Sequence, residues 1–116
     1  MIELDEFTHA YVECALWAST DENGENLDIY SVDDIAPATL ADMIADCKDF
    51  QSSNDLTDYP LVRAGHDFWL TRNRHGAGFW ENDYGTRAQC KLLTENARAY
   101  GDCGLYVGDD GLIYAQ

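Results

Sequence analysis

Hydrophobic residues recur every three or four positions in three segments of the chain, a spacing that places them on one face of an α-helix. These segments are residues 4–18, 37–51 and 86–100. Pro37 suits the first turn of the second helix, where its missing N–H needs no partner, and Thr86 begins a capping box ahead of the third. The three apolar faces comprise Leu4, Phe7, Tyr11 and Ala18, widened by Leu16 and Trp17; Leu40, Ile44, Cys47 and Phe50; and Cys90, Leu93, Ala97 and Tyr100.

Two further regions have the pattern of β-hairpins, in which short apolar runs flank a turn rich in Asn, Asp and Gly. Residues 66–72 and 77–80 form the first pair of predicted strands. Residues 105–107 and 112–114 form the second pair. Strands this short predict a small antiparallel sheet that needs helices to cover it.

Together these elements predict an α+β fold: a single domain of about three helices packed on a small antiparallel sheet of two hairpins. A length of 116 residues suits one domain, and 46% hydrophobic residues can build its core. We divide the domain into an acidic helical half, residues 1–60, and a hairpin-helix-hairpin half, residues 61–116.

The charge of the chain is concentrated in the first of these halves. The formal net charge is −15, and up to Pro60 there are fifteen Asp and Glu residues and one base, Lys48. The second half has seven acids and six bases. Because charge of one sign opposes compact folding by self-repulsion, so strong an asymmetry suggests a use for it, namely an electropositive partner.

Two sets of acids are candidates for contact with that partner. Asp42, Asp46 and Asp49 lie at i, i+4 and i+7, on one face of the predicted second helix, with one charge per roughly 3.5 Å of axis. One strand of a nucleic acid carries about one charge per 3.4 Å, so this helix face is comparable in charge density. The densest acidic run is made of Asp21, Glu22, Glu25, Asp28, Asp33 and Asp34. The alternative is that these acids are a solvated surface and serve only solubility.

The residues predict neither a metal site nor a cofactor. A calcium-binding EF-hand loop beginning at Asp21 would need Gly at its sixth position, which is Asn26. The four cysteines lie far apart with no metal-site spacing, and we expect them to be reduced and mostly buried. No stretch is apolar enough to span a bilayer, so we expect no membrane contact and a cytoplasmic location.

The second half resembles a family of small, uncharacterised proteins of bacteriophages and mobile elements. The resemblance rests on the sequences AGHDFWLTRN and HGAGFW within residues 64–80, and on LYVGDDGLIY in residues 105–114. It covers roughly half of the chain. It implies a phage or mobile-element origin and carries no established activity. Small phage proteins often oppose host defence, and some of these are acidic mimics of DNA.

We therefore expect a phage-encoded inhibitor, not an enzyme, that mimics DNA and blocks the nucleic-acid-binding groove of a host defence complex such as a CRISPR effector or a restriction enzyme. Its partner would be a basic nucleic-acid-binding host protein; we expect no direct binding of nucleic acid, and the chain could form a homodimer.

Two alternatives stay open. One is an accessory protein that binds a host protein through the aromatic first hairpin, with Trp69 and Trp80 as the sensitive positions. The other is a small hydrolase that uses His66 and His75. Most of the aromatic rings in and near this hairpin, and Trp17, are expected to pack in the core.

Overall fold

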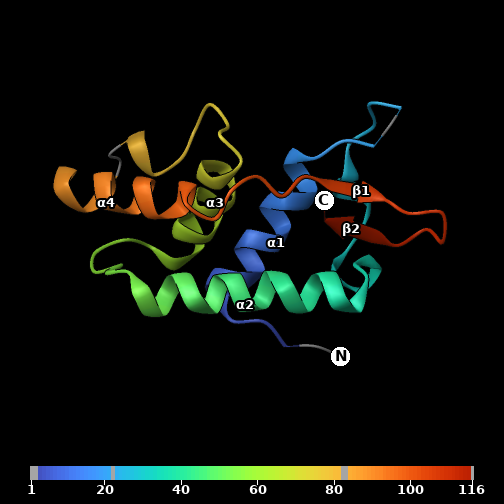
Figure 1. Cartoon of the computed structure of the whole chain (residues 1–116), viewed down its shortest axis with the longest axis horizontal. Helices are drawn as coiled ribbons and strands as arrows, with labels where there is room; N and C mark the ends of the chain where they lie inside the picture. Colours follow the sequence, from blue (N-terminus) through green and yellow to red (C-terminus); the bar gives the residue numbers. More distant parts are fainter. Residues whose placement is uncertain (1–2, 22, 82–83, 116) are drawn as a thin grey trace.

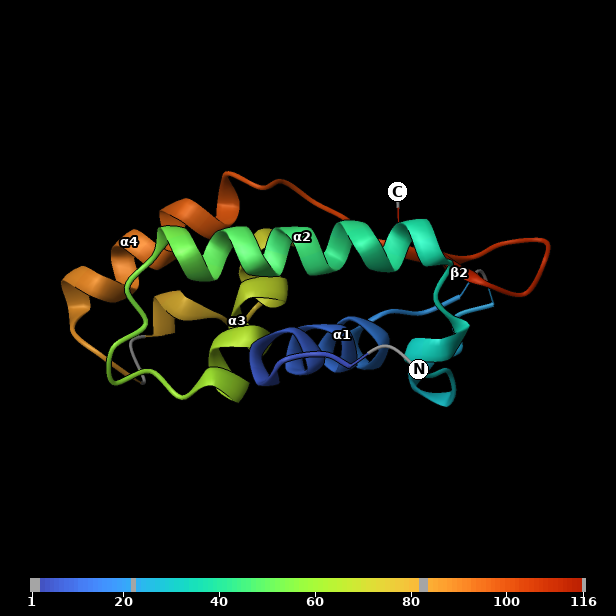
Figure 2. The ribbon, with the colours of Figure 1, turned by 90° about the horizontal axis from the view of Figure 1, so that it is seen from below.

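The computed structural model describes residues 3–21, 23–81 and 84–115. The long helix α2 runs along the long axis of the molecule, while α1 and α3 pack together on one side of it (Figures 1 and 2). Helix α4 lies at one end, and the strands β1 and β2 lie at the other (Figure 1). The bounds are α1 (Glu6–Ala18), α2 (Pro37–Ser53), α3 (Leu61–Arg72), α4 (Arg87–Arg98), β1 (Leu105–Val107) and β2 (Ile113–Ala115), with short 3₁₀ turns η1 (Leu27–Ile29), η2 (Val32–Asp34) and η3 (Phe79–Glu81).

Local signals in the sequence set the helix starts. The side chain of Asp5 accepts a hydrogen bond from the backbone N–H of Thr8 (2.8 Å) and caps α1. Pro37 occupies the first turn of α2, as its sequence position predicts. At α4 the reciprocal Thr86–Gln89 capping box is present, with the Gln89 backbone N–H 3.0 Å from Thr86 Oγ1. The three helices expected from apolar periodicity are thus confirmed.

The predicted first hairpin is wrong, because the segment folds as α3 followed by a turn and η3. The buried face of α3 includes Ala64, Phe68 and Thr71, which lie at i, i+4 and i+7. The predicted strand began at His66 and so left out the start of the helix. In the seven residues 66–72, the spacing of apolar residues does not distinguish the two-residue period of a strand from the 3.6-residue period of a helix. The fold is a single compact domain of mixed helix and sheet with four helices in the described residues, not three.

The second hairpin is confirmed. Strands β1 and β2 pair antiparallel, with Leu105 opposite Ala115 and Val107 opposite Ile113. The hairpin is fastened to the start of α2, since the Ala36 backbone N–H donates to the carbonyl oxygen of Ile113 (2.9 Å). In the described residues the sheet therefore has two strands, at the end of the molecule away from α4.

The core is built around stacked aromatic rings from α1, α2, α3 and η3. The rings of Phe50 and Phe68 stack with centroids 4.2 Å apart, and Phe7 and Phe79 lie 6.1 and 5.7 Å from Phe50. All four are fully buried. Because each ring is supplied by a different element, this cluster joins parts of the chain that are distant in sequence.

Helices α1 and α3 approach closely at Gly65. A Cβ atom added there would lie 2.2 Å from the backbone carbonyl oxygen of Phe7 and 3.0 Å from the Cβ of Ala10. Only glycine permits this separation, so its poor helix propensity is offset by the contact between the two helices.

A buried guanidinium joins four parts of the structure at the end of α3. Arg72 Nη1 donates to Asp46 Oδ2 (2.8 Å) on α2 and to the hydroxyl of Tyr11 (3.2 Å) on α1. Its other nitrogens donate to the carbonyl oxygens of Tyr100 and Gly101 beyond α4, at 3.1 and 2.9 Å. The Arg72 side chain is 6% exposed and that of Asp46 is 40% exposed. Asp46 is therefore the counter-charge of a buried cation.

We expect Gly65→Ala to lower the free energy of unfolding by about 1–2 kcal/mol, because the clash with the Phe7 carbonyl exceeds the roughly 1 kcal/mol gained in helix propensity. Urea denaturation followed by circular dichroism measures this change. Gly76→Ala is the control, since nothing lies within 4 Å of its added methyl group. Equal stability of the two variants would contradict the close contact between α1 and α3.

We expect Asp46→Ala to lower the free energy of unfolding by about 2–3 kcal/mol, because it leaves the Arg72 guanidinium buried without its carboxylate. Asp42→Ala, one turn earlier on α2 and exposed, should change stability by less than about 0.5 kcal/mol. Asp46→Asn should fall between them, since an amide oxygen still accepts a hydrogen bond. If Asp46→Ala unfolds at the same urea concentration as Asp42→Ala, the ion pair does not support the fold.

Candidate functional site

Positive and negative residues occupy different parts of the chain. All seven Lys and Arg residues lie in residues 48–98, together with seven of the acids. The other fifteen acids lie in residues 1–47 and 99–116, which contain no Lys or Arg. The entire net charge of −15 therefore resides in the two outer segments. Figures 1 and 2 show residues 19–21 and 23–26, the η1–η2 region and the turn between β1 and β2 at one end of the molecule.

We call this region the acidic end and define it by Asp21, Glu25, Asp28, Asp33, Asp34, Asp109 and Asp110. Asp21 and Asp34 are half-buried, and the other five are exposed. Of the six acids in the dense run predicted from sequence, five lie here, and Glu22 falls outside the described residues. Asp109 and Asp110 were not predicted, because only the contact between the hairpin and the start of α2 places them at this end.

Some of these carboxylates also shape the chain that carries them. Asp21 Oδ1 accepts from the backbone N–H groups of Asn23 and Glu25 at 2.8 and 2.9 Å. Asp110 accepts from the Tyr114 hydroxyl (2.6 Å) and the Leu112 N–H (3.0 Å), and these hydrogen bonds lower the pKa of its carboxyl group. Donors that stabilise the ionised form keep this turn negatively charged at neutral pH.

The three acids of the predicted α2 stripe are not equivalent in the structure. Asp42 is exposed, whereas Asp46 neutralises Arg72. Asp49 accepts a hydrogen bond from the hydroxyl of Tyr100, whose pKa is raised by burial and by this bond. Two of the three carboxylates thus hold other parts of the protein, and the stripe does not offer three unengaged charges to a partner.

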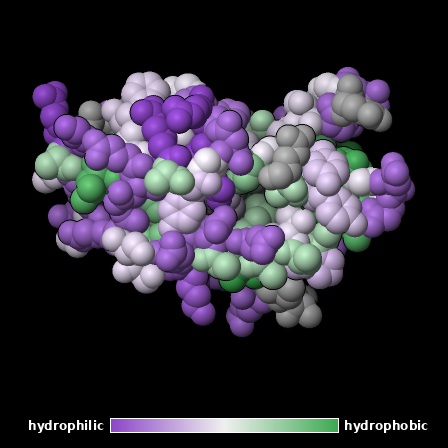
Figure 3. All heavy atoms as spheres, in the orientation of Figure 1, coloured by the Kyte–Doolittle hydropathy of each residue, from purple (hydrophilic) through white to green (hydrophobic). Residues whose placement is uncertain are grey.

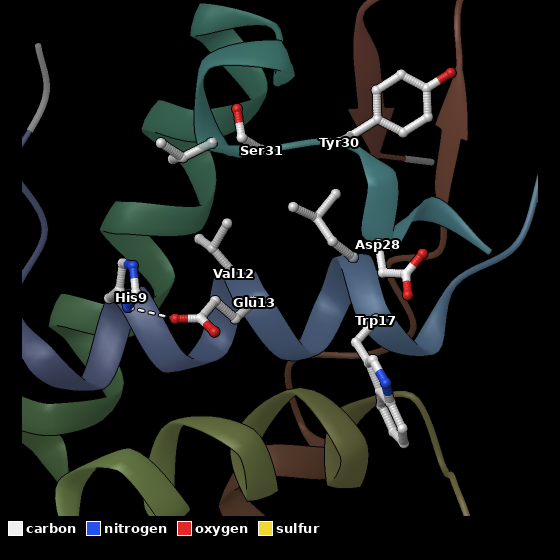
Figure 4. Close-up of a pocket in the computed structure, with 9 residues that line it drawn as sticks. His9, Val12, Glu13, Trp17, Asp28, Tyr30 and Ser31 are labelled. Atoms are coloured by element: carbon white, nitrogen blue, oxygen red, sulfur yellow. Dashed lines mark ion pairs between the residues drawn. The ribbon is translucent and has the colours of Figure 1, made fainter.

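An apolar groove with an acidic rim adjoins the acidic end. It has a volume of about 380 Å³ and lies between α1 and the segment that follows η1. Its lining residues are Val12, Leu16, Tyr30 and Val32, with His9, Glu13, Trp17, Asp28 and Ser31 around them. Figure 4 shows His9 and Glu13 turned towards each other, and their Nδ1 and Oε1 atoms lie 2.7 Å apart.

Two large hydrophobic side chains are exposed beside this groove. Trp17 is 65% exposed, and Ile29, next to Asp28, is 78% exposed. Trp17 follows His9 and Glu13 at intervals of four residues, on the outer face of α1, and extends away from the segment that contains Tyr30 (Figure 4). The prediction that Trp17 widens the buried stripe of the first helix is therefore wrong. Periodicity alone could not decide this, because Trp17 lies at the edge of the apolar face.

The aromatic and histidine residues of the supposed first hairpin are divided between core and surface. Trp69 is 2% exposed, whereas Trp80 is 44% exposed. His66 is half-buried on α3, and the exposed His75 has its ring 5.0 Å from that of Trp69. The predicted aromatic hairpin surface does not exist. In the described part of the chain, no three His, Cys, Asp or Glu side chains are placed to hold a metal ion.

The cysteines lie where apolar periodicity predicts them. Cys14, Cys47 and Cys90 are buried, Cys103 is half-buried, and all four are free thiols. Burial raises the pKa of Cys14 to about 12 and that of Cys47 further, so these thiols stay protonated and unreactive. Across residues 3–21, 23–81 and 84–115, no helix combines the length and apolar character that crossing a membrane requires.

The space-filling view shows a second concave region. In the orientation of Figure 1 the surface is hollowed near its middle, between α2 and the segment that leads to β1 (Figure 3). A pocket of about 430 Å³ lies between these elements, and its lining includes Asp42, Asp46, Asp102 and Arg72. Two of these residues, Arg72 and Asp46, pair with each other. We regard the pocket as part of the Arg72 junction.

Comparison with known proteins gave no match: neither a family model, nor a curated protein, nor a solved structure matches this chain.

Proposed function

We propose that the protein is a phage-encoded acidic inhibitor that blocks the nucleic-acid-binding groove of a host defence complex, with its acidic end in the place of a nucleic acid backbone. The gathering of acids from separate chain segments at one end, without any Lys or Arg in those segments, carries this proposal. The phage origin rests on the resemblance of residues 64–80 and 105–114. The protein acts without a cofactor, in the cytoplasm of the host bacterium.

A basic groove attracts such a surface before contact is made. Oppositely charged partners associate up to about 10³-fold faster than neutral ones at low ionic strength, and this advantage declines as salt screens the charges. A nucleic-acid-binding groove already contains Lys and Arg side chains spaced for phosphates. The acidic end supplies carboxylates on backbone turns that are held by their own hydrogen bonds, so little ordering is needed on binding.

The groove beside α1 supplies apolar and aromatic contacts, which surface charge alone does not provide. Exposed ion pairs contribute little to affinity, whereas buried aromatic residues dominate most interfaces. Trp17 offers a face for the guanidinium or ammonium group of the partner, and Glu13 and Asp28 lie close by to pair with it. The apolar lining from Val12 and Val32 suits the methylene stem of the same Arg or Lys side chain.

The structure changes which of the predicted acids we assign to the interface. Asp28 and Asp33 are exposed, and no side chain among the described residues forms a hydrogen bond or ion pair with their carboxylates. Asp46 and Asp49 have internal partners, so replacing them would disturb the fold as well as the surface. We therefore propose the acidic end and its groove, rather than the α2 stripe, as the binding surface.

Reversing two acids of this surface should weaken capture of the target at least tenfold. The variant is Asp28→Lys with Asp33→Lys, compared with Glu3→Lys and Asp55→Lys, which changes the net charge by the same amount at other sites. The immobilised protein is exposed to lysates of bacteria that carry CRISPR and restriction systems, and nucleic-acid-binding proteins released by duplex DNA are identified by mass spectrometry. Equal recovery by both variants, or no protein that DNA displaces, would refute the proposal.

Removing the Trp17 side chain should change the dissociation rate constant rather than the association rate constant. Trp17→Ala is expected to accelerate dissociation from the captured target about tenfold or more, because it removes an aromatic ring that the partner would bury, whereas the charge reversal mainly slows association. Surface plasmon resonance separates the two rates. Leu92→Ala, at another exposed apolar position, on α4, is the control. An unchanged dissociation rate for Trp17→Ala would exclude this residue from the interface.

A further inference from the structure

A third concave surface lies at the opposite end of the molecule from the acidic end. It is a groove of about 500 Å³ between η3 and α4, within the range of 300–1,000 Å³ usual for small-molecule sites. Its lining residues are Trp80, Arg87, Lys91, Thr94, Glu95 and Arg98. They combine an aromatic ring, three cations, a hydroxyl group and one carboxylate, and the proposed inhibition does not use them.

The cations follow one face of α4. Arg87, Lys91 and Arg98 lie at i, i+4 and i+11, so Lys91 is about 6 Å along the axis from Arg87 and about 10 Å from Arg98. All three are exposed, and no carboxylate among the described residues lies within 4 Å of their charged nitrogens. A chain with twenty-two acids needs no added bases for solubility, so their alignment on one face favours an anionic ligand.

The indole of Trp80 is presented by a supported backbone. Its neighbour Phe79 is fully buried, and the Phe79 backbone N–H donates to Thr71 Oγ1 (3.1 Å). Gly78 lies against the same threonine, where a Cβ atom would approach Thr71 Oγ1 to 2.3 Å. The turn that carries Trp80 is therefore fixed against α3, and an exposed ring fixed in this way is a surface on which a flat aromatic ligand can stack.

Glu95 restricts the classes of ligand that this groove can bind. A carboxylate among the cations repels a polyanion or an acidic peptide, but it accepts hydrogen bonds from hydroxyl or amino groups. Thr94 donates its hydroxyl proton to the Cys90 carbonyl oxygen (2.8 Å), so its oxygen is also left to accept. The groove thus fits a ligand that has an aromatic ring, hydroxyl donors and an anionic group together.

We propose that this groove binds a nucleoside phosphate, with the base against Trp80, the ribose hydroxyls near Glu95 and the phosphates at the α4 cations. Arg and Lys both bind phosphate through charge-assisted hydrogen bonds. The net charge of −15 does not prevent binding, because the molecule is 43 Å long and a Debye length at physiological salt is about 8 Å. The nearby Glu81 lies 3.7 Å from an Arg63 nitrogen, which reduces its repulsion of the ligand. This inference is independent of the proposed inhibition.

Isothermal titration calorimetry of the whole chain tests the proposal with ATP, GTP, CTP and UTP, and with adenosine and inorganic phosphate as partial ligands. We expect saturable binding of at least one nucleotide, with adenosine and phosphate each at least tenfold weaker. Trp80→Ala and Lys91→Glu should each weaken nucleotide binding at least tenfold. Tyr106→Ala and Lys48→Ala, an exposed ring and a base outside the groove, should leave it unchanged.

The proposal would be overturned if no nucleotide saturates the protein up to about 1 mM, or if nucleotide and inorganic phosphate bind with equal affinity. It would also be overturned if nucleotide binding survives both groove substitutions. A protein that binds a single-stranded oligonucleotide or a polyglutamate peptide, but no mononucleotide, would overturn it as well. Because both substituted residues are exposed, circular dichroism should show all variants folded, and lost binding can then be assigned to the groove.

Discussion

The ion pair between Arg72 and Asp46 is the interaction on which the arrangement of the helices depends. Arg72 ends α3, and its hydrogen bonds reach α1, α2 and the chain beyond α4. A guanidinium this deeply buried requires a partner for every donor, so each of these elements has little freedom to move without leaving a cation unpaired. The guanidinium also lies 5.8 Å from the Phe68 ring centroid and so joins the polar junction to the aromatic core. The junction holds the chain beyond α4 at Tyr100 and Gly101, and the contact of the C-terminal hairpin with the start of α2 then places two carboxylates at the acidic end.

The same ion pair gives one acid of the α2 stripe a structural role. On sequence alone Asp42, Asp46 and Asp49 form one stripe of equal members, because helical spacing shows only that they share a face. Whether a carboxylate on that face is available depends on residues that are 26 and 51 positions away in the cases of Arg72 and Tyr100. Net charge is therefore a poor guide to which carboxylates on a helix face are left without an internal partner.

Much of the fold could be predicted from local signals. The caps and apolar periodicity of α1, α2 and α4 are encoded within a few residues, and so is the glycine-bounded turn of the hairpin. Helix α3 was missed because its buried face includes Gly65 and Asp67, which do not look apolar, and because a short segment with adjacent aromatics fits two periods. The acidic end was predicted in part. Its N-terminal acids form a dense run in the sequence, whereas Asp109 and Asp110 join them only through tertiary contacts. Exposure of Trp17 and Ile29 carried no sequence signal.

The separation of charge along the molecule has a consequence for how it meets a partner. With the net charge confined to residues 1–47 and 99–116 and a balanced remainder at the far end, the protein is a strong electric dipole as well as an anion. In the proposed complex with a basic partner, the electric field of that partner would exert a torque on the dipole and turn the acidic end towards it during approach. The rotational search that normally slows docking of two specific patches would then be shortened before they touch. The α4 groove, at the opposite end of the molecule, would remain open to solvent in that complex.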